Sequence, residues 1–355
     1  MNISSKNLKE VRLVIIFVLI SIVLGGALSV LMDKHVSLKA VVSGGVTGFW
    51  ISSLCAAGNY AFLYRLRYLP FTAHLLLSTA YYTFAASAVL AIKFVIFYHV
   101  HDISQWSRNL FSATLLTLGL SFTGAFVLML RRMLGPNVLL NFFTGRYHTP
   151  VEEERIFLFA DIVSSTTIAE KIGDLNFHVF LNDYFYDITD AILSAGGEIY
   201  KYVGDEIIVS WRVSDSIRNT RCIQSFFEIK KSIERKKQRY LDKFGFIPYC
   251  RAGLHCGPVV VGEMGDFKQE IAFLGDTVNT TARIQEACRE YGVDLLVSSE
   301  LLDKLLIPPD YKATSLGKIR LKGKDKPMEL FGIEKSPAAF PRGLADATRS
   351  LSRMR

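Results

Sequence analysis

The chain has only five cysteines in 355 residues, and no two of them form a CxxC pair or another spacing typical of a metal site. Cys55 lies in an apolar stretch, whereas the other four are spread over residues 222–288. This pattern argues against a zinc ribbon and against a thioredoxin-like redox motif. We therefore expect reduced, unpaired thiols in a reducing cytoplasm.

Charged side chains are absent from four long stretches. Each lacks Asp, Glu, Lys and Arg for about 20 residues or more, which is the length that a helix needs to cross a bilayer core. The first is not a good signal peptide, because its apolar run is long, no small-residue cleavage site is obvious and three more such stretches follow. We therefore predict an α-helical membrane domain over residues 1–133, with four transmembrane helices at Leu13–Met32, Ala40–Tyr64, Tyr68–Ile92 and Asn109–Leu130.

Basic residues flank these stretches on alternate sides. They precede the first stretch, join the second to the third and follow the fourth, and such segments face the cytoplasm. We predict a multi-pass protein of the cell (inner) membrane, with its N-terminus and the rest of the chain cytoplasmic. The residues are Lys6, Lys9, Arg12, Arg65, Arg67, Arg131 and Arg132.

Net charge is absent from residues 136–355. Residues 1–135 hold 11 of the 41 basic and 3 of the 33 acidic side chains, so the whole excess of +8 lies in the membrane half. A nucleic-acid-binding protein would need a basic patch on its soluble part. We therefore expect contact with anionic membrane lipid and no nucleic-acid partner.

Glycines in the predicted spans suggest close helix packing. Gly44 and Gly48 have the GxxxG spacing, and Gly25 and Gly26 are adjacent in the first span. Small residues let two helices approach closely, either within one chain or between two.

The remaining chain divides into three parts. Residues 134–152 contain two glycines and two prolines around a short apolar segment, which predicts a coupling linker. Residues 153–335 are expected to form a cytoplasmic domain. Residues 336–355 form a basic tail that we expect to be disordered.

Apolar periodicity within 153–335 predicts alternating strands and helices. The order βαββαβ, with further strands, predicts an α+β ferredoxin-like domain with a mostly antiparallel sheet and helices on one side. The predicted strands are 156–161, 199–203, 207–211, 247–254, 258–263, 269–274 and 294–298, and the predicted helices are 176–194, 216–243 and one from Asp276.

Two aspartates end neighbouring elements of this sheet. Asp161 ends the first strand, and Asp205 lies in the turn of the following hairpin. Because the first strand lies beside that hairpin in a ferredoxin-like sheet, the two carboxylates could meet. Such a pair suits a hard divalent cation that takes its other oxygens from water and a phosphate chain.

The segment after Asp161 is rich in hydroxyl groups. The backbone N–H groups of Ser164, Ser165 and Thr166 lead towards a helix and could bind phosphate oxygens. The alternative is an ordinary N-cap region.

Asn279 and Arg283 lie four residues apart and share one face of a predicted helix. Side by side, an amide and a guanidinium can orient a ribose and stabilise charge on a reacting phosphorus. The alternative is an ordinary surface hydrogen bond between the two side chains. The pair therefore indicates a catalytic site only because the two aspartates occur in the same chain.

Five segments in this order and spacing resemble the catalytic domain of class III adenylyl and guanylyl cyclases. The resemblance covers residues 150 to 335. The segments are FLFADIVSST (157–166), YKYVGDEIIVSW (200–211), RAGLHCGPVVVGEMG (251–265), FLGDTVNTTARIQ (273–285) and LKGK (321–324).

The resemblance implies roles for particular residues. Asp161 and Asp205, with the Ile162 carbonyl, would bind two Mg²⁺ or Mn²⁺ ions per active site. Asn279 would orient the ribose, and Arg283 would stabilise the α-phosphate. These groups come from two chains in the family, which implies a head-to-tail homodimer. Lys322 and Lys324 are expected near the β- and γ-phosphates, with a solvated hairpin as the alternative.

Base choice follows from hydrogen-bond chemistry. Adenine N1 is an acceptor, whereas guanine N1–H is a donor, so the lysine at the family's base-reading position, Lys201, favours ATP. The family usually places Asp, Thr or Ser where this chain has Ala272, and alanine cannot accept from the adenine amino group. Discrimination against GTP is therefore expected to be weaker.

The sequence thus predicts a membrane-bound adenylate cyclase that converts ATP to 3′,5′-cyclic AMP and pyrophosphate, with an external or lipid signal received by its membrane domain. A guanylate or mixed-specificity cyclase is one alternative. A membrane receptor with a silent cyclase-like domain is another, favoured only by Ala272. The sequence argues against a diguanylate cyclase. VGDEI stands where that family has a GGDEF-like turn, and that family has no segment that corresponds to GDTVNTTAR.

Overall fold

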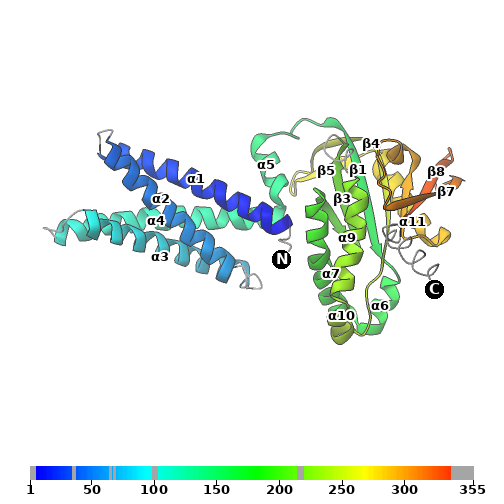
Figure 1. The fold of residues 1–355 in the computed structure, drawn as a ribbon, viewed down its shortest axis with the longest axis horizontal. Helices are drawn as coiled ribbons and strands as arrows, with labels where there is room; N and C mark the ends of the chain where they lie inside the picture. The colour runs from blue at the N-terminus through cyan, green and yellow to red at the C-terminus, as the bar shows by residue number, and fades with distance from the viewer. Residues whose placement is uncertain are drawn as a thin grey trace, which may run out of the picture. The chain divides into compact units, whose positions relative to one another are not determined.

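The computed structural model describes residues 5–33, 37–63, 66, 69–97, 103–213 and 220–336. The chain divides into two compact units, Met1–Arg146 and Tyr147–Arg355 (Figure 1). Nearly all of the predicted tail, 337–355, lies outside the described residues.

The first unit is helical, as predicted. Its helices are α1 (Ser5–Asp33), α2 (Leu38–Gly58) with a π-helical end (Asn59–Leu63), α3 (Phe71–Phe97), α4 (Ile103–Leu134) and α5 (Pro136–Thr144). Within the described residues, the segments Leu38–Ala61, Phe71–Lys93 and Phe111–Leu134 are long and apolar enough to cross a membrane. The apolar part of α1, Val14–Val30, is shorter.

The predicted glycine packing occurs within one chain, between α1 and α2. A methyl group added to Gly44 would collide with the carbonyl of Gly25, and one added to Gly48 would collide with the carbonyl of Ser21. These glycines therefore allow the two backbones to touch, which is the usual role of small residues in membrane helices.

The second unit is built on an eight-stranded sheet in the order β2-β3-β1-β4-β6-β8-β7, with β5 paired to β4 outside this path. Its elements β1, α7, β2, β3, α9 and β4 form the predicted βαββαβ arrangement, and the pairs among β2, β3, β1 and β4 are antiparallel. The strands are β1 (Val151–Ile162), β2 (Glu198–Val203), β3 (Glu206–Arg212), β4 (Cys250–Met264), β5 (Glu270–Leu274), β6 (Leu295–Ser298), β7 (Tyr311–Ile319) and β8 (Met328–Lys335).

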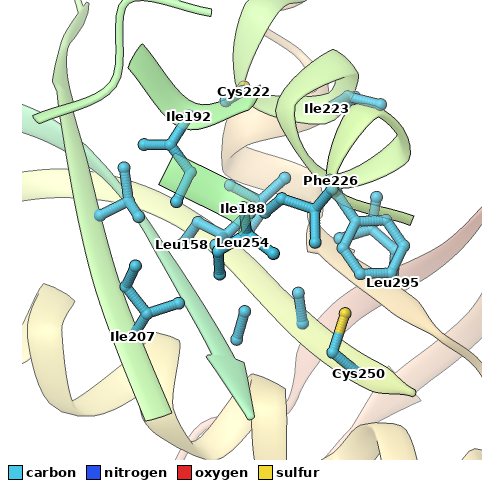
Figure 2. Packing of buried hydrophobic residues seen from close by; sticks show 14 of the residues in the cluster. Leu158, Ile188, Ile192, Ile207, Cys222, Ile223, Phe226, Cys250, Leu254 and Leu295 are labelled. Atoms are coloured by element: carbon cyan, nitrogen blue, oxygen red, sulfur yellow. The ribbon is translucent and has the colours of Figure 1, made fainter. Parts of the chain in front are cut away.

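The main core lies between one face of this sheet and two helices, α7 (Asp174–Ser194) and α9 (Arg221–Arg235). Alternate residues of a strand point to the same face, so Leu158 of β1 and Leu254 of β4 both face these helices. Figure 2 shows Ile188 of α7 and Phe226 of α9 packed close to both leucines.

Contrary to prediction, helices cover both faces of the sheet. Helix α11 (Asp276–Tyr291) packs on the face opposite to α7 and α9. Two glycines of β4 make room for it, because a Cβ at Gly253 would meet the backbone of Gln285 and one at Gly257 would meet the Thr277 side chain.

Other element boundaries also differ from the predictions. The expected strands 247–254 and 258–263 are one continuous strand, β4, which pairs with β1 from Cys250 to Val261. The expected helix 216–243 is α9 followed by α10 (Lys237–Phe244), and residues 214–219 lie outside the described part. The short helices α6 (Ser165–Ile172) and α12 (Ser299–Leu302) and the β7–β8 hairpin were not predicted as separate elements.

A buried carboxylate joins α7 to the region of α9 and α10. The Asp187 side chain is fully buried and accepts hydrogen bonds from Lys236 Nζ at 2.6 Å, Arg239 Nη2 at 2.5 Å and Tyr240 Oη at 2.8 Å. A buried charge needs such partners, because loss of hydration is otherwise uncompensated. Asp187 therefore fixes how these helices pack on the sheet.

We predict that Asp187→Ala lowers the free energy of unfolding by about 3 kcal/mol, because two cations and a hydroxyl lose their shared acceptor. For a domain of this size the unfolding temperature should fall by roughly 6–12 °C. Fluorescence of the buried Trp211 during heating of the full-length chain in detergent would measure this.

Asp183→Ala is the matched control, one turn earlier on α7. Its ion pair with Lys243 is partly exposed, so its removal should cost less than about 1 kcal/mol. Equal shifts for the two variants would contradict the structural role of Asp187.

Candidate active site

Two aspartates meet at one end of the sheet. Asp161 is the penultimate residue of β1, and Asp205 follows Gly204 in the turn between β2 and β3. The ladder pairs Ala160 with Ile207, so the end of β1 lies beside the start of β3. Gly204 has φ 61°, a conformation that glycine adopts without strain and that allows this tight turn.

The carboxylates of this corner repel one another. Burial, followed by contact with the Asp205 carboxylate, raises the pKa of Asp161 to about 8. Burial, followed by the charges of Asp205 and Glu286, raises the pKa of Glu206 to about 7. Oδ2 of Asp205 is buried and has no hydrogen-bond partner among the described residues. A cation at this corner would therefore compensate both the repulsion and the orphaned oxygen.

The donor set fits a hard divalent cation. In the described part of the chain, no group of three or more His, Cys, Asp and Glu side chains is arranged so that it could hold a metal ion by itself. A cation between Asp161 and Asp205 would take further oxygens from water, a phosphate chain and a main-chain carbonyl, for which Ile162 is the adjacent candidate. This combination is typical of Mg²⁺ and Mn²⁺ sites and unsuited to structural zinc.

The hydroxyl-rich turn leads directly into α6. Ser164 occupies the position before the helix with φ 60°, and its side chain makes no capping hydrogen bond. Ser164 is therefore the N-cap residue by position, as in the ordinary alternative, but its hydroxyl group does not cap the helix. The first amides of a helix lack intrahelical acceptors, so the N–H groups of Ser165 and Thr166 are suited to bind an anion beside the metal corner.

A β-bulge places Lys201 on the same face as Asp161. The β2–β3 ladder pairs Ile199 with Val209 and then Lys201 with Ile208, so Tyr200 is the extra residue. Without the bulge, Lys201 would follow Ile199 to the α7 face. Bulges commonly re-aim side chains beside active sites. The shift puts Lys201 on the face that carries α11.

Lys201 reaches strand β5. Its Nζ lies 2.9 Å from Glu270 Oε1, and both side chains are about two-fifths exposed. The hydrogen bond to Glu270 raises the pKa of Lys201, and the same bond lowers the pKa of Glu270. Both groups are therefore ionised at neutral pH. Ala272, two residues further along β5, is buried opposite Gly262.

Helix α11 presents the predicted polar pair. Asn279 is exposed, and Arg283 is partly exposed with its Nη1 2.7 and 2.8 Å from the two carboxylate oxygens of Glu286. The charge of Glu286 on α11 also contributes to the raised pKa of Glu206 in the metal corner. The structure thus brings the aspartates, Lys201 and α11 to one face of the sheet.

The two C-terminal lysines differ in position. Lys324 forms an ion pair with Asp276, the first residue of α11, whereas Lys322 is exposed. Lys324 therefore lies beside the helix that carries Asn279 and Arg283. The LKGK segment lies between β7 and β8.

Sequence reasoning missed Glu270 and Glu206. Glu270 lies 69 residues from Lys201, and only the fold brings them together. Its position two residues before Ala272 on a strand was a usable signal, because alternate residues share a face. Glu206 directly follows Asp205 and is the third carboxylate of this corner.

We predict that Asp205→Asn stabilises the metal-free chain at pH 8 by about 1–2 kcal/mol, a value reduced by solvent screening at this half-exposed corner. The pKa of Asp161 is about 8 in the folded chain and 3.8 ordinarily. The associated stability is therefore complete below pH 4 and is lost as the pH rises through 8. Thermal unfolding of the full-length chain in detergent with a chelator would measure this.

Mg²⁺ or Mn²⁺ should then stabilise the wild type at pH 8 and leave Asp205→Asn unchanged. Asp303→Asn, at an exposed position after α12, is the control and should resemble the wild type. A metal response that survives in Asp205→Asn would remove Asp205 from the site.

Comparison with known proteins identifies relatives of this arrangement. Residues 149–335 match the family model described as the adenylate and guanylate cyclase catalytic domain. The chain is 36% identical to adenylate cyclase 2 of Rhizobium meliloti (strain 1021) over 274 residues, which cover 76% of this chain and 75% of that protein. It is 29% identical to the adenylate cyclase of Anabaena cylindrica over 186 residues, or 50% of this chain and 36% of that protein.

A solved structure of a bacterial light-regulated adenylyl cyclase has the same fold. It superposes with a TM-score of 0.54 at 21% identity, covering 63% of this chain and 66% of that one. The likeness supports the sheet and helix arrangement described above.

Proposed function

Because the chain belongs to the adenylate and guanylate cyclase catalytic domain family, we propose that it converts ATP to 3′,5′-cyclic AMP and pyrophosphate at the cytoplasmic face of a membrane. One observation supports this most strongly. The carboxylates of Asp161 and Asp205 repel each other, and a buried oxygen of Asp205 has no hydrogen-bond partner among the described residues, so a divalent cation of the kind that this reaction needs would compensate both.

In this proposal the chain's residues position ATP for attack by its own ribose. The two bound ions would lower the pKa of the 3′-hydroxyl and neutralise the triphosphate. Asn279 orients the ribose, and Arg283 stabilises the negative charge that develops on the α-phosphate. The bond from O3′ to the α-phosphorus forms as the bond to pyrophosphate breaks, and the O3′ proton leaves to solvent.

The N–H groups of Ser164, Ser165 and Thr166 would bind phosphate oxygens at the start of α6. Lys324 is the better candidate of the two lysines for the β- and γ-phosphates, because it already lies at the start of α11. Lys201 would donate to adenine N1. Mg²⁺ or Mn²⁺, two per site, is the proposed cofactor.

We further propose a head-to-tail homodimer with two sites. Each site would take Asp161 and Asp205 from one protomer, and Lys201, Asn279 and Arg283 from the other. Exposed apolar residues on β4, β5 and the turn between them support a partner surface there, because such patches mark interaction sites. These residues are Val260, Met264, Phe267 and Leu274.

The apolar helices support a membrane anchor, with Arg131 and Arg132 at the end of α4 favouring a cytoplasmic second unit. We propose that the anchor contacts anionic lipid, helps the chain to dimerise and passes an external or lipid signal through residues 134–152. Replacing the spans with a soluble dimeriser should abolish regulation, and unchanged regulation would contradict this role.

Nucleotide turnover by the full-length chain in detergent tests the activity. With Mg²⁺ or Mn²⁺ we expect cyclic AMP from ATP, no product from Asp205→Ala, and a loss of about 10²–10³-fold in kcat for Arg283→Ala. Comparable cyclic GMP from GTP would favour a mixed-specificity cyclase, for which the buried Ala272 is the supporting observation. No product with either metal would favour a silent receptor domain.

Mixing two inactive variants tests the dimer. Chains carrying Asp205→Ala and chains carrying Arg283→Ala should recover activity when co-expressed, because a mixed head-to-tail dimer keeps one intact site. Random pairing would give about a quarter of wild-type activity. Co-expressed Asp205→Ala and Asp161→Ala chains are the control and should stay inactive, since both changes fall on the metal side. Equal inactivity of both mixtures would contradict shared sites.

A further inference from the structure

Strand β5 carries a carboxylate, Glu270, close to Ala272. Glu270 lies two residues earlier, so it is on the same face of the strand. Among the described strands β5 pairs only with β4, and the side chain of its first residue, Glu270, reaches Lys201. Gly262, which is paired with Ala272, adds no side chain.

The Glu270 carboxylate has acceptor capacity to spare. Its Oε1 accepts from Lys201 at 2.9 Å, and its Oε2 lies 3.9 Å from Lys268 Nζ, too far for a strong hydrogen bond. A carboxylate offers about four lone-pair sites, and an ammonium group has three donors. The ion pair therefore leaves an acceptor on Glu270 and donors on Lys201 for a ligand.

We propose that Glu270 is a specificity-determining residue, which accepts from the 6-amino group of adenine in place of the side chain that Ala272 lacks and holds Lys201 against N1. The inference rests on the proposed adenylate cyclase function. The alanine at position 272 led us to expect weak discrimination against GTP. With Glu270 as the acceptor, two residues earlier on β5, we expect the site to discriminate against GTP.

The order of the two groups selects the base. With Lys201 facing position 1 and Glu270 facing position 6, a donor meets the N1 acceptor of adenine and an acceptor meets its amino group. In the same pose guanine presents N1–H to Lys201 and O6 to Glu270, so both contacts are mismatched. A site whose polar groups remain unpaired rejects the wrong ligand strongly.

The test compares kcat/KM for ATP and GTP, using the full-length chain in detergent. We expect the wild type to prefer ATP, and Glu270→Gln to lower the ratio of ATP to GTP use at least about 10-fold, because an amide can also donate to guanine O6. Lys268→Gln is the matched control. It removes the more distant cation from Glu270 and should leave the ratio within about twofold of the wild type.

A rescue variant separates base reading from folding. Glu270→Ala should lower the ATP to GTP ratio, and Glu270→Ala with Ala272→Asp should restore it, since a carboxylate returns to the same strand face. An equal loss of ATP and GTP use in Glu270→Gln, with the ratio unchanged, would overturn the inference. Wild-type chain that makes no cyclic AMP would instead overturn the proposed function on which it rests.

Discussion

The antiparallel ladder between β1 and β4 sets the position of every other part of the second unit. It runs without interruption from the pair Val151 and Val261 to the pair Ile162 and Cys250. Asp161 lies near one end of this ladder, and Val151, the first residue of β1, lies at the other end. Because alternate residues face opposite sides, the same ladder separates the core under α7 and α9 from the face that carries α11. A slip of one residue would exchange these two faces.

The active-site corner is electrostatically unfavourable on its own, and the rest of the unit compensates for it. Asp161, Asp205 and Glu206 lie close together and partly buried, where their charged forms are disfavoured. By contrast, the buried side chains of Asp187 and Arg155 are paired with opposite charges. A functional site is expected to hold unfavourable charge interactions that a bound ligand would relieve. The surrounding structure is expected to pair its own buried charges.

The sequence was sufficient for features that depend on local periodicity or neighbouring strands. The apolar helices, α7 and the hairpin carrying Asp205 all followed from it, and so did the common face of Asn279 and Arg283. Strand β4 was predicted as two strands divided at residues 255–257. Gly257 lies in that gap, where it allows the close approach of the Thr277 side chain on α11. The β7 strand was missed because it is mostly exposed and lacks a clear apolar alternation.

The contacts around Lys201 could not be predicted, because they depend on a bulge that no periodic pattern reveals. An unbroken β2 would place Lys201 on the α7 face, away from Asp161 and from β5. The extra residue, Tyr200, is held by Phe273 of β5, whose N–H donates to the Tyr200 hydroxyl at 3.3 Å and whose ring lies 4.7 Å away edge-on.

Phe273 in turn lies 5.1 Å from the buried guanidinium of Arg155, which hydrogen bonds to Glu198 of β2 and to Tyr147. Strand β5 is therefore held beside Lys201 by two sets of contacts. One is the ion pair of Glu270 with Lys201, and the other is the contact of Phe273 with Arg155, near the start of β1. A buried guanidinium tolerates little displacement of its partners, because a lost hydrogen bond to a charged group is costly. A shift of Tyr147 would consequently act on the same strand that carries Glu270 and Ala272.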